Sequence, residues 1–307
     1  MDETLRASLG GAVGRAVRRA ERVHGGDVAR SYRVELDDGG LLFAKTHPAA
    51  PAHFFTTEAA GLRWLREPAA LAVPAVIAVS DGGTDGRPTA DVPNFLVLEW
   101  IDEAAGEGAG GRHGEGTGHD EREAAFGAAL AALHREGAPC FGRLDRRTTG
   151  SRGLPNDPCE DWATFYATRR LLPLARLARD GRALSERAIG ELEALADRLG
   201  EVGGPAEPAA RLHGDLWAGN RLVDRAGRSW LIDPAAHGGH REFDLAMMRL
   251  FGGFGPACFS AYAEVFPLAD GWAQRIALHQ VAPLVVHAIK FGGGYRAAAE
   301  AAIARYR

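Results

Sequence analysis

Lysine is nearly absent from this chain of 307 residues: of its 36 lysines and arginines, only Lys45 and Lys290 are lysine. Each is of interest, because a compact ammonium on a flexible stem binds partners that the planar arginine fork does not suit. Charges of both signs are interspersed, with 40 acidic residues and a formal net charge of −4. No basic stripe offers the affinity of a nucleic-acid-binding protein, so we expect no nucleic-acid partner.

Cysteine and long apolar runs are also scarce. The three cysteines, Cys140, Cys159 and Cys258, lack the C-x-x-C spacing of a zinc or redox site, and their odd number does not suit a disulfide framework. This usage favours a cytoplasmic protein. No stretch is long and apolar enough to span a bilayer, so we expect no membrane partner. Residues 1–23 are predicted to form an amphipathic helix rather than a signal peptide.

The region before residue 101 has the pattern of a small sheet with one helix. Strands are predicted over residues 30–36, 41–46, 75–79 and 94–100. The first two flank the turn sequence DDGG and should pair as a hairpin. Apolar residues recur at helical spacing from Phe54 to Glu67, which predicts a helix with Thr56 or Thr57 as its N-cap.

A glycine-dense connection, Gly106 to Gly118, separates this region from a mostly helical remainder. Helices are predicted over residues 121–136, 161–180 and 185–200, with two short β-type runs near Asn220 and Asp233. A chain of this length can bury two modest cores. We therefore expect a bilobal α+β fold, with an N-terminal nucleotide-binding lobe over 1–101 and a C-terminal catalytic and substrate-binding lobe over 102–307.

Three oxygen-bearing side chains indicate a phosphotransfer site. Asp215 and Asn220 have the D-x-x-x-x-N spacing of a phosphotransfer catalytic loop, and Asp233 ends a β-type run soon after. An aspartate in the first position can accept the proton of an attacking hydroxyl, so Asp215 is the predicted catalytic base. Asn220 and Asp233 are predicted to bind Mg²⁺, which prefers oxygen ligands. Each residue alone is more often a turn former, but the combination favours this function.

The predicted phosphate-binding residues lie upstream. Lys45 ends a β-type run, and Glu58 follows thirteen residues later on the predicted helix, which suits a lysine–glutamate pair that holds the phosphates of ATP. Glu58 alone could equally be a solvated helix charge. Neither lysine follows a glycine as a Walker A motif requires, so the expected nucleotide fold is kinase-like.

Two further segments are candidates for nucleotide contact. The turn Gly25-Gly26 precedes the first predicted strand, where backbone N–H groups could cover the triphosphate, although such a turn is also ordinary. Glu99 and Ile101 lie just before the glycine-rich connection, where a kinase hinge offers backbone groups to adenine. A plain buried strand is an equal and compatible interpretation of that run.

These motifs resemble the fructosamine kinase, or ketosamine-3-kinase, family, a relative of the aminoglycoside phosphotransferases and choline kinases within the protein-kinase-like fold. The specific segments are HGDLWAGN, residues 213–220, and LIDPAAHGGHREFDLAMMRLFGGF, residues 231–254. The resemblance implies transfer of phosphate from ATP, with Mg²⁺, to the 3-hydroxyl of a ketosamine such as fructosamine or ribulosamine. The acceptor would be a small molecule or a glycated protein.

The resemblance also implies roles for individual residues, which agree with those above for Asp215, Asn220, Asp233, Lys45 and Glu58. Trp217 could stack on the sugar ring, or equally be a packed core tryptophan. Glu242 and Asp244 are expected to anchor the following helix, with Asp244 bonding the catalytic-loop backbone.

The acceptor is the least determined part of this prediction. Arg146 and Arg147 stand where the family typically has smaller polar groups. An aminoglycoside or amino-alcohol phosphotransferase is the first alternative, and its cationic acceptor would need an acidic pocket. A nucleotide-binding pseudokinase is the second, although no base or metal ligand is missing from the sequence. The oligomeric state stays open.

Overall fold

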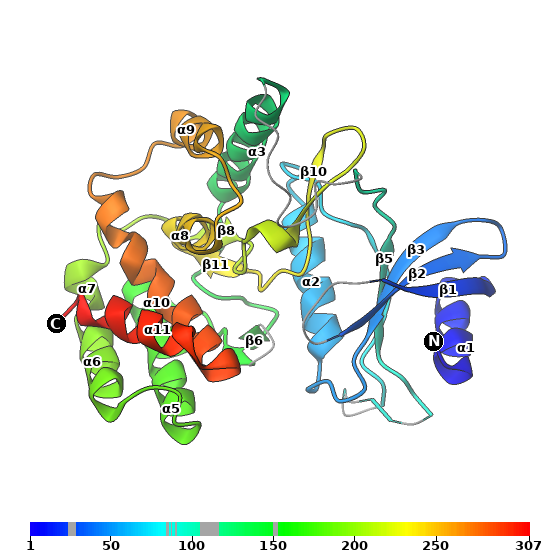
Figure 1. Ribbon diagram of the computed structural model, residues 1–307, viewed down its shortest axis with the longest axis horizontal. Helices are drawn as coiled ribbons and strands as arrows, with labels where there is room; N and C mark the ends of the chain where they lie inside the picture. The colour runs from blue at the N-terminus through cyan, green and yellow to red at the C-terminus, as the bar shows by residue number, and fades with distance from the viewer. Residues whose placement is uncertain (24–28, 84–85, 87, 90, 105–116, 150–152) are drawn as a thin grey trace. The chain divides into compact units, whose positions relative to one another are not determined.

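The computed structural model describes residues 1–23, 29–83, 86, 88–89, 91–104, 117–149 and 153–307 (Figure 1). Contacts divide the chain into two compact units. The first unit contains Met1–Gly108 and Leu222–Pro234, and the second contains Ala109–Arg221 and Ala235–Arg307. The chain therefore returns to the first unit for a short excursion that includes Asp233.

The first unit is built on one five-stranded antiparallel sheet. Its strands are β1 (Val17–Val23), β2 (Arg30–Leu36), β3 (Leu41–Thr46), β4 (Val76–Ser80) and β5 (Phe95–Glu99). They lie in the order β1-β2-β3-β5-β4. The predicted hairpin is confirmed, because β2 pairs with β3 from Arg30 opposite Thr46 to Glu35 opposite Leu41.

The prediction of one helix over residues 1–23 is wrong. Helix α1 (Glu3–Val13) ends at Gly14, which adopts a left-handed φ of 70° at the C-cap, a conformation that glycine allows at no steric cost. The chain then enters β1, which pairs with β2. Leu5 and Leu9 of α1 are buried in one cluster with sheet residues such as Val34 and Val97. This packing fixes α1 on the sheet.

Helix α2 (Phe54–Arg66) packs on β4 and β5 through buried apolar residues that include Leu62 and Leu65. The helix itself is confirmed, but the predicted caps at Thr56 and Thr57 are wrong. Asp81 caps the helix instead, because its carboxylate accepts the backbone N–H groups of Phe55 at 2.7 Å and Thr56 at 3.1 Å. The cap comes from a residue that follows β4, so no local pattern could reveal it.

The short excursion forms a hairpin of β9 (Arg221–Val223) and β10 (Ser229–Leu231). Trp230 forms a β-bridge with Ala72, and Val223 accepts the N–H of Ala104 at 3.0 Å. These contacts join the hairpin to the first unit. They place the segment after β10, and with it Asp233, beside the sheet.

The second unit is mostly helical (Figure 1). Its helical segments are α3 (Thr117–Arg135), α4 (Trp162–Phe165), a π-helical turn (Tyr166–Leu171), α5 (Leu172–Asp180), α6 (Glu186–Asp197), α7 (Leu199–Val202), a 3₁₀ turn (Ala218–Asn220), α8 (Glu242–Phe251), α9 (Pro256–Val265), α10 (Trp272–Phe291) and α11 (Gly294–Ala304). Two short strand pairs accompany them: β6 (Thr148–Thr149) with β7 (Leu154–Pro155), and β8 (Ala210–Leu212) with β11 (His237–Gly239). In the described part of the chain, every helix is too short or too polar to cross a membrane.

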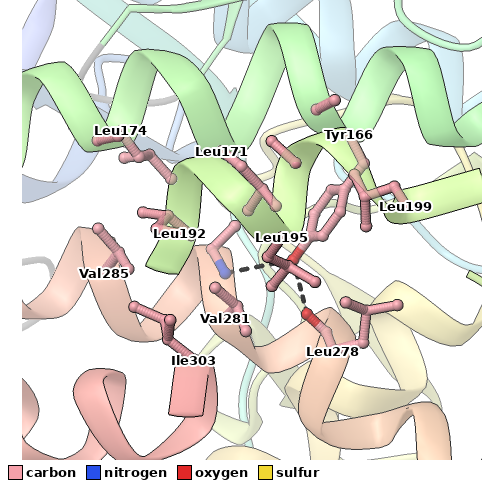
Figure 2. Close-up of a cluster of buried hydrophobic side chains, with 14 of the residues drawn as sticks. Tyr166, Leu171, Leu174, Leu192, Leu195, Leu199, Leu278, Val281, Val285 and Ile303 are labelled. Atoms are coloured by element: carbon pink, nitrogen blue, oxygen red, sulfur yellow. Dashed lines mark hydrogen bonds between the residues drawn. The ribbon is translucent and has the colours of Figure 1, made fainter. Parts of the chain in front are cut away.

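The core of the second unit gathers side chains from α5, α6, α10 and α11 around Tyr166 (Figure 2). The Tyr166 hydroxyl lies 3.0 Å from the carbonyl oxygen of Leu278 and 3.3 Å from that of His279, and it accepts the N–H of Ala282 at 3.2 Å. Pro283 lies inside α10 and has no N–H for the His279 carbonyl. The Tyr166 hydroxyl therefore provides the His279 carbonyl with a hydrogen-bond donor in place of the missing N–H.

Candidate active site

The catalytic loop follows β8 and is held by a buried carboxylate. Asp244, in the first turn of α8, accepts the backbone N–H groups of His213 at 2.7 Å and Gly214 at 2.9 Å. Its side chain is fully buried. Burial alone would raise the pKa of Asp244, but bonds from His134 and Gly214 outweigh burial and hold it below its usual range. The expected anchoring of the loop by Asp244 is confirmed.

Two further contacts fix the start of this loop. Gly214 has a φ of 80°, and a Cβ atom there would collide with the carbonyl oxygen of Ala235, so the position requires glycine. His213 is fully buried, and its Nδ1 accepts the N–H of Asp215 at 3.2 Å. His213 thus shapes the loop through a local hydrogen bond.

Asp215 and Asn220 lie together at the end of this loop. The Asn220 side-chain amide donates to the Asp215 carbonyl oxygen at 2.8 Å and lies 3.3 Å from its carboxylate Oδ2. This contact uses the amide nitrogen of Asn220, so its amide oxygen is the atom suited to a hard cation. Asp215 is only half-buried, so a substrate hydroxyl can approach it.

A second layer of residues was not predicted from the sequence. His134 on α3 places Nε2 3.3 Å from Asp244 Oδ2, and its Nδ1 lies 2.8 Å from the Tyr262 hydroxyl on α9. Both His134 and Tyr262 are buried. They support the carboxylate that holds the loop. His134 lies 110 positions from Asp244 and 128 from Tyr262 in the sequence, so no spacing in the sequence marks these contacts.

The first unit assembles the predicted phosphate-binding pair and adds Asp233 to it. The Lys45 ammonium lies 2.5 Å from Glu58 Oε1 and 2.7 Å from Asp233 Oδ1, with only 6% of its side chain exposed. Burial alone would lower the pKa of Lys45, but the charges of Asp233 and Glu58 outweigh it and raise the pKa. Burial raises the pKa of Glu58 to about 7, against the opposing effect of Lys45. Two carboxylates thus share one ammonium.

The backbone at Asp233 is unusual. Its φ of 52° lies in the left-handed region that non-glycine residues rarely adopt, a kind of strain that clusters at functional sites. The Asp233 side chain is 38% exposed, more than those of Lys45 and Glu58. A partly exposed carboxylate, with the amide oxygen of Asn220, is the donor chemistry that Mg²⁺ takes. Each residue therefore offers a donor that fits a magnesium ion, and their joint binding of the ion stays a prediction.

The other predicted contacts have mixed outcomes. The Glu99 carboxylate accepts the N–H of Ala75 at 2.9 Å and pairs with Arg66 at 3.2 Å, so its side chain has a structural role. Ile101 lies two residues after the end of β5 and is half-buried. The backbone role of both residues stays a prediction, and the Gly25-Gly26 turn lies outside the described residues.

Trp217 is 37% exposed, and its ring lies 6.2 Å from that of Phe251 in an edge-to-face contact. This exposure does not suit the core alternative. Sugar stacking by Trp217 stays a prediction.

Solved structures with the same fold define the class. The macrolide 2'-phosphotransferase type I matches with a TM-score of 0.59 at 17% identity, over 98% of this chain and 95% of that one. A choline kinase from Streptococcus pneumoniae matches with a TM-score of 0.59 at 14% identity, over 94% of each chain. The fold is a two-lobed α+β fold of the protein-kinase-like class.

The family follows from closer relatives. The fructosamine kinase family matches residues 1–307. A protein from Thermobifida fusca, assigned as a fructosamine-3-kinase, has a TM-score of 0.83 and 38% identity over 99% of this chain and 98% of that one. A "Probable ketoamine kinase" of Enterococcus faecium is 34% identical over 89% of this chain and 90% of its own. The protein-ribulosamine 3-kinase of Arabidopsis thaliana is 31% identical over 88% of this chain and 77% of its own. The chain belongs to the fructosamine kinase family. The protein is therefore an ATP-dependent phosphotransferase with an alcohol acceptor.

Proposed function

We propose that this protein transfers the γ-phosphoryl group of ATP to the 3-hydroxyl of a ketosamine such as a fructosamine or ribulosamine. The observation that carries the proposal is a catalytic loop with Asp215 beside Asn220, clamped by Asp244, in a chain of the fructosamine kinase family. The Arabidopsis relative is named for ribulosamine and the Thermobifida relative for fructosamine. Both names support a ketosamine acceptor.

The proposed chemistry assigns one role to each residue. Asp215 accepts the proton of the sugar hydroxyl as its oxygen forms a bond to the γ-phosphorus, while the bond to the β–γ bridging oxygen breaks and ADP leaves. Asn220 and Asp233 would hold Mg²⁺. When bound, the ion neutralises charge on the phosphates. Lys45 keeps its contact with Glu58 and turns from Asp233 to the phosphates.

The remaining contacts complete the proposal. Backbone groups from Glu99 to Ile101 bind adenine, the Gly25-Gly26 turn covers the phosphates, and Trp217 stacks on the sugar. Residues 1–101, with the excursion over residues 222–234, then act as the nucleotide-binding lobe, and the rest of residues 102–307 act as the catalytic and substrate-binding lobe. The three cysteines are free, which supports a reducing cytoplasmic setting.

An acceptor panel tests this function directly. The purified protein would be incubated with ATP, Mg²⁺ and each acceptor: fructose-lysine, ribulose-lysine, a glycated protein, an aminoglycoside and choline. ADP release gives the rate, and phosphorus NMR gives the position of the new phosphate. We expect turnover on a ketosamine with phosphate on its 3-hydroxyl. Turnover on only the aminoglycoside or choline would overturn the acceptor assignment, and ATP binding without transfer to any acceptor would support the pseudokinase alternative.

A further inference from the structure

Five arginines surround the β6–β7 hairpin in the second unit, and we name this set the arginine collar. Its members are Arg143, Arg146, Arg147, Arg169 and Arg170. Two carboxylates pair with the collar: Asp145 binds Arg143 through two bonds of 2.8 Å, and Asp157 pairs with Arg147. The nearby Asp161 is used as the N-cap of α4. The five guanidinium groups of the collar therefore outnumber these two carboxylates.

Arg170 is the clearest case of an unbalanced charge. It is 3% exposed, and its guanidinium donates to the carbonyl oxygens of Pro155 at 2.6 Å and Arg169 at 3.0 Å and to the amide oxygen of Asn156 at 3.1 Å. All three acceptors are neutral. Burial lowers the pKa of Arg170 to about 9. A buried cation normally has an anionic partner, because leaving water is costly.

Two buried donors in this region have no acceptor among the described residues. Asn156, which contacts Arg170, is fully buried, and its side-chain nitrogen makes no hydrogen bond to any described residue. The Nε of Arg146 is buried and likewise unpartnered, although its terminal nitrogen donates to the Asp145 carbonyl oxygen at 3.0 Å. Buried polar groups are rarely left without a partner. Orphaned N–H donors beside guanidinium groups suit the oxygens of a carboxylate or phosphate.

The collar is attached to the strands that carry the catalytic loop. Gly142 exchanges two backbone bonds, of 2.8 and 2.9 Å, with Gly238 of β11, whose partner strand β8 leads directly into the loop. The Arg170 guanidinium lies 4.5 Å from the centre of the Phe165 ring, which stacks on His237 at 5.5 Å. The collar and the predicted base therefore belong to one packed unit.

We propose that the arginine collar is a subsite for an anionic group on the acceptor, either a carboxylate of its amine portion or a phosphate on its sugar. The inference rests on the proposed ketosamine kinase function and narrows its substrate class. Arg147 is the most accessible member, with its side chain 85% exposed, and Arg146 is half-buried, so these two would meet the anion first. The buried Arg170 supplies further positive charge. A cationic aminoglycoside does not suit such a surface.

The test compares three ketosamines that share one sugar. The first is formed from an alkylamine and is neutral, the second is formed from an amino acid and keeps its carboxylate, and the third is the alkylamine ketosamine with a phosphate at the end of the sugar. The readout is the ratio of kcat/KM for each anionic acceptor to that for the neutral one. Proteins tested are the wild type, the double variant R146Q/R147Q and the control R187Q. Arg187 lies on α6 with its side chain 68% exposed and pairs with Glu191.

The wild type and R187Q should favour one anionic acceptor roughly tenfold to a hundredfold, as charge-assisted hydrogen bonds allow, and R146Q/R147Q should lose most of this preference. The preferred acceptor identifies carboxylate or phosphate as the source. An equal ratio in the wild type, or a preference that survives in R146Q/R147Q, would overturn the subsite.

Should no ketosamine be phosphorylated, the proposed function fails while the collar stays testable. The Tm is then measured with and without inorganic phosphate. A rise in Tm that occurs in the wild type and in R187Q, but not in R146Q/R147Q, supports anion binding by the collar. No rise, or an equal rise in all three proteins, contradicts it.

Discussion

Replacing Asp244 by asparagine tests how the catalytic loop is held. The wild-type carboxylate accepts N–H groups from His213 at 2.7 Å and Gly214 at 2.9 Å, in a fully buried position. In Asp244→Asn, one oxygen becomes an NH₂ group that faces another donor. The substitution changes almost no volume, so its effect isolates charge and hydrogen bonding from packing.

The magnitude follows from the number of bonds lost. A hydrogen bond to a charged group contributes about 1.5–3 kcal/mol, and a buried donor left unpaired costs about 1–3 kcal/mol. With at least one such bond lost and one donor stranded, the free energy of unfolding should fall by about 3–5 kcal/mol. This is a large part of the roughly 5–15 kcal/mol typical of folded proteins.

Urea unfolding, with kcat measured on the same preparation, checks both consequences. We expect a lower urea midpoint at unchanged slope, and a kcat reduced at least tenfold because the loop that carries Asp215 is displaced. Asp197→Asn is the control, since Asp197 is exposed at the end of α6. If Asp244→Asn unfolds at the wild-type midpoint and keeps its kcat, the carboxylate does not hold the loop.

Two more predictions concern lysine and acid stability. Lys45→Arg places a bulky planar cation between Glu58 and Asp233, so steady-state kinetics should give a higher KM for ATP and a kcat at least tenfold lower. The control Lys290→Arg should keep both values. Wild-type kinetics in Lys45→Arg would contradict the role of Lys45. Burial lowers the pKa of His237 to about 3 and that of His240 to about 4, from 6.5. As the pH falls, the unfolded chain therefore binds more protons than the folded one, and stability should fall by about 2 kcal/mol per histidine between pH 7 and 5. Equal urea midpoints at pH 7 and 5 would contradict this.

Local sequence patterns predicted the elements that local forces determine. The hairpin of β2 and β3 follows from β-type runs around a four-residue turn, and α2 follows from helical spacing. The strand β1 was missed because its sequence, VRRAERV, has three arginines and no clear alternation, and its pairing with β2 decides its structure. The capping of α2 by Asp81 was missed for the same reason, since the partners meet only after folding.

The candidate site divides in the same way. Asp215 and Asn220 were identified by their spacing, and their contact at 2.8 Å is local. Lys45 was identified by its rarity, but only the fold shows that Asp233 joins Glu58 in binding it. The sequence drew attention to Arg146 and Arg147, whereas burial of Arg170 among neutral acceptors became visible only in three dimensions.

Replacing Asp215 by asparagine, followed by single-turnover transfer of labelled γ-phosphate from ATP to a ketosamine, tests the account most directly. The proposed base predicts a rate about 10² to 10⁴ lower or more. ATP affinity by calorimetry and the urea midpoint should stay close to wild type, because Asp215 is half-buried and the contact of its carboxylate with Asn220 lies within the same loop. Transfer by Asp215→Asn at the wild-type rate would contradict the assignment of the base and, with it, the proposed mechanism.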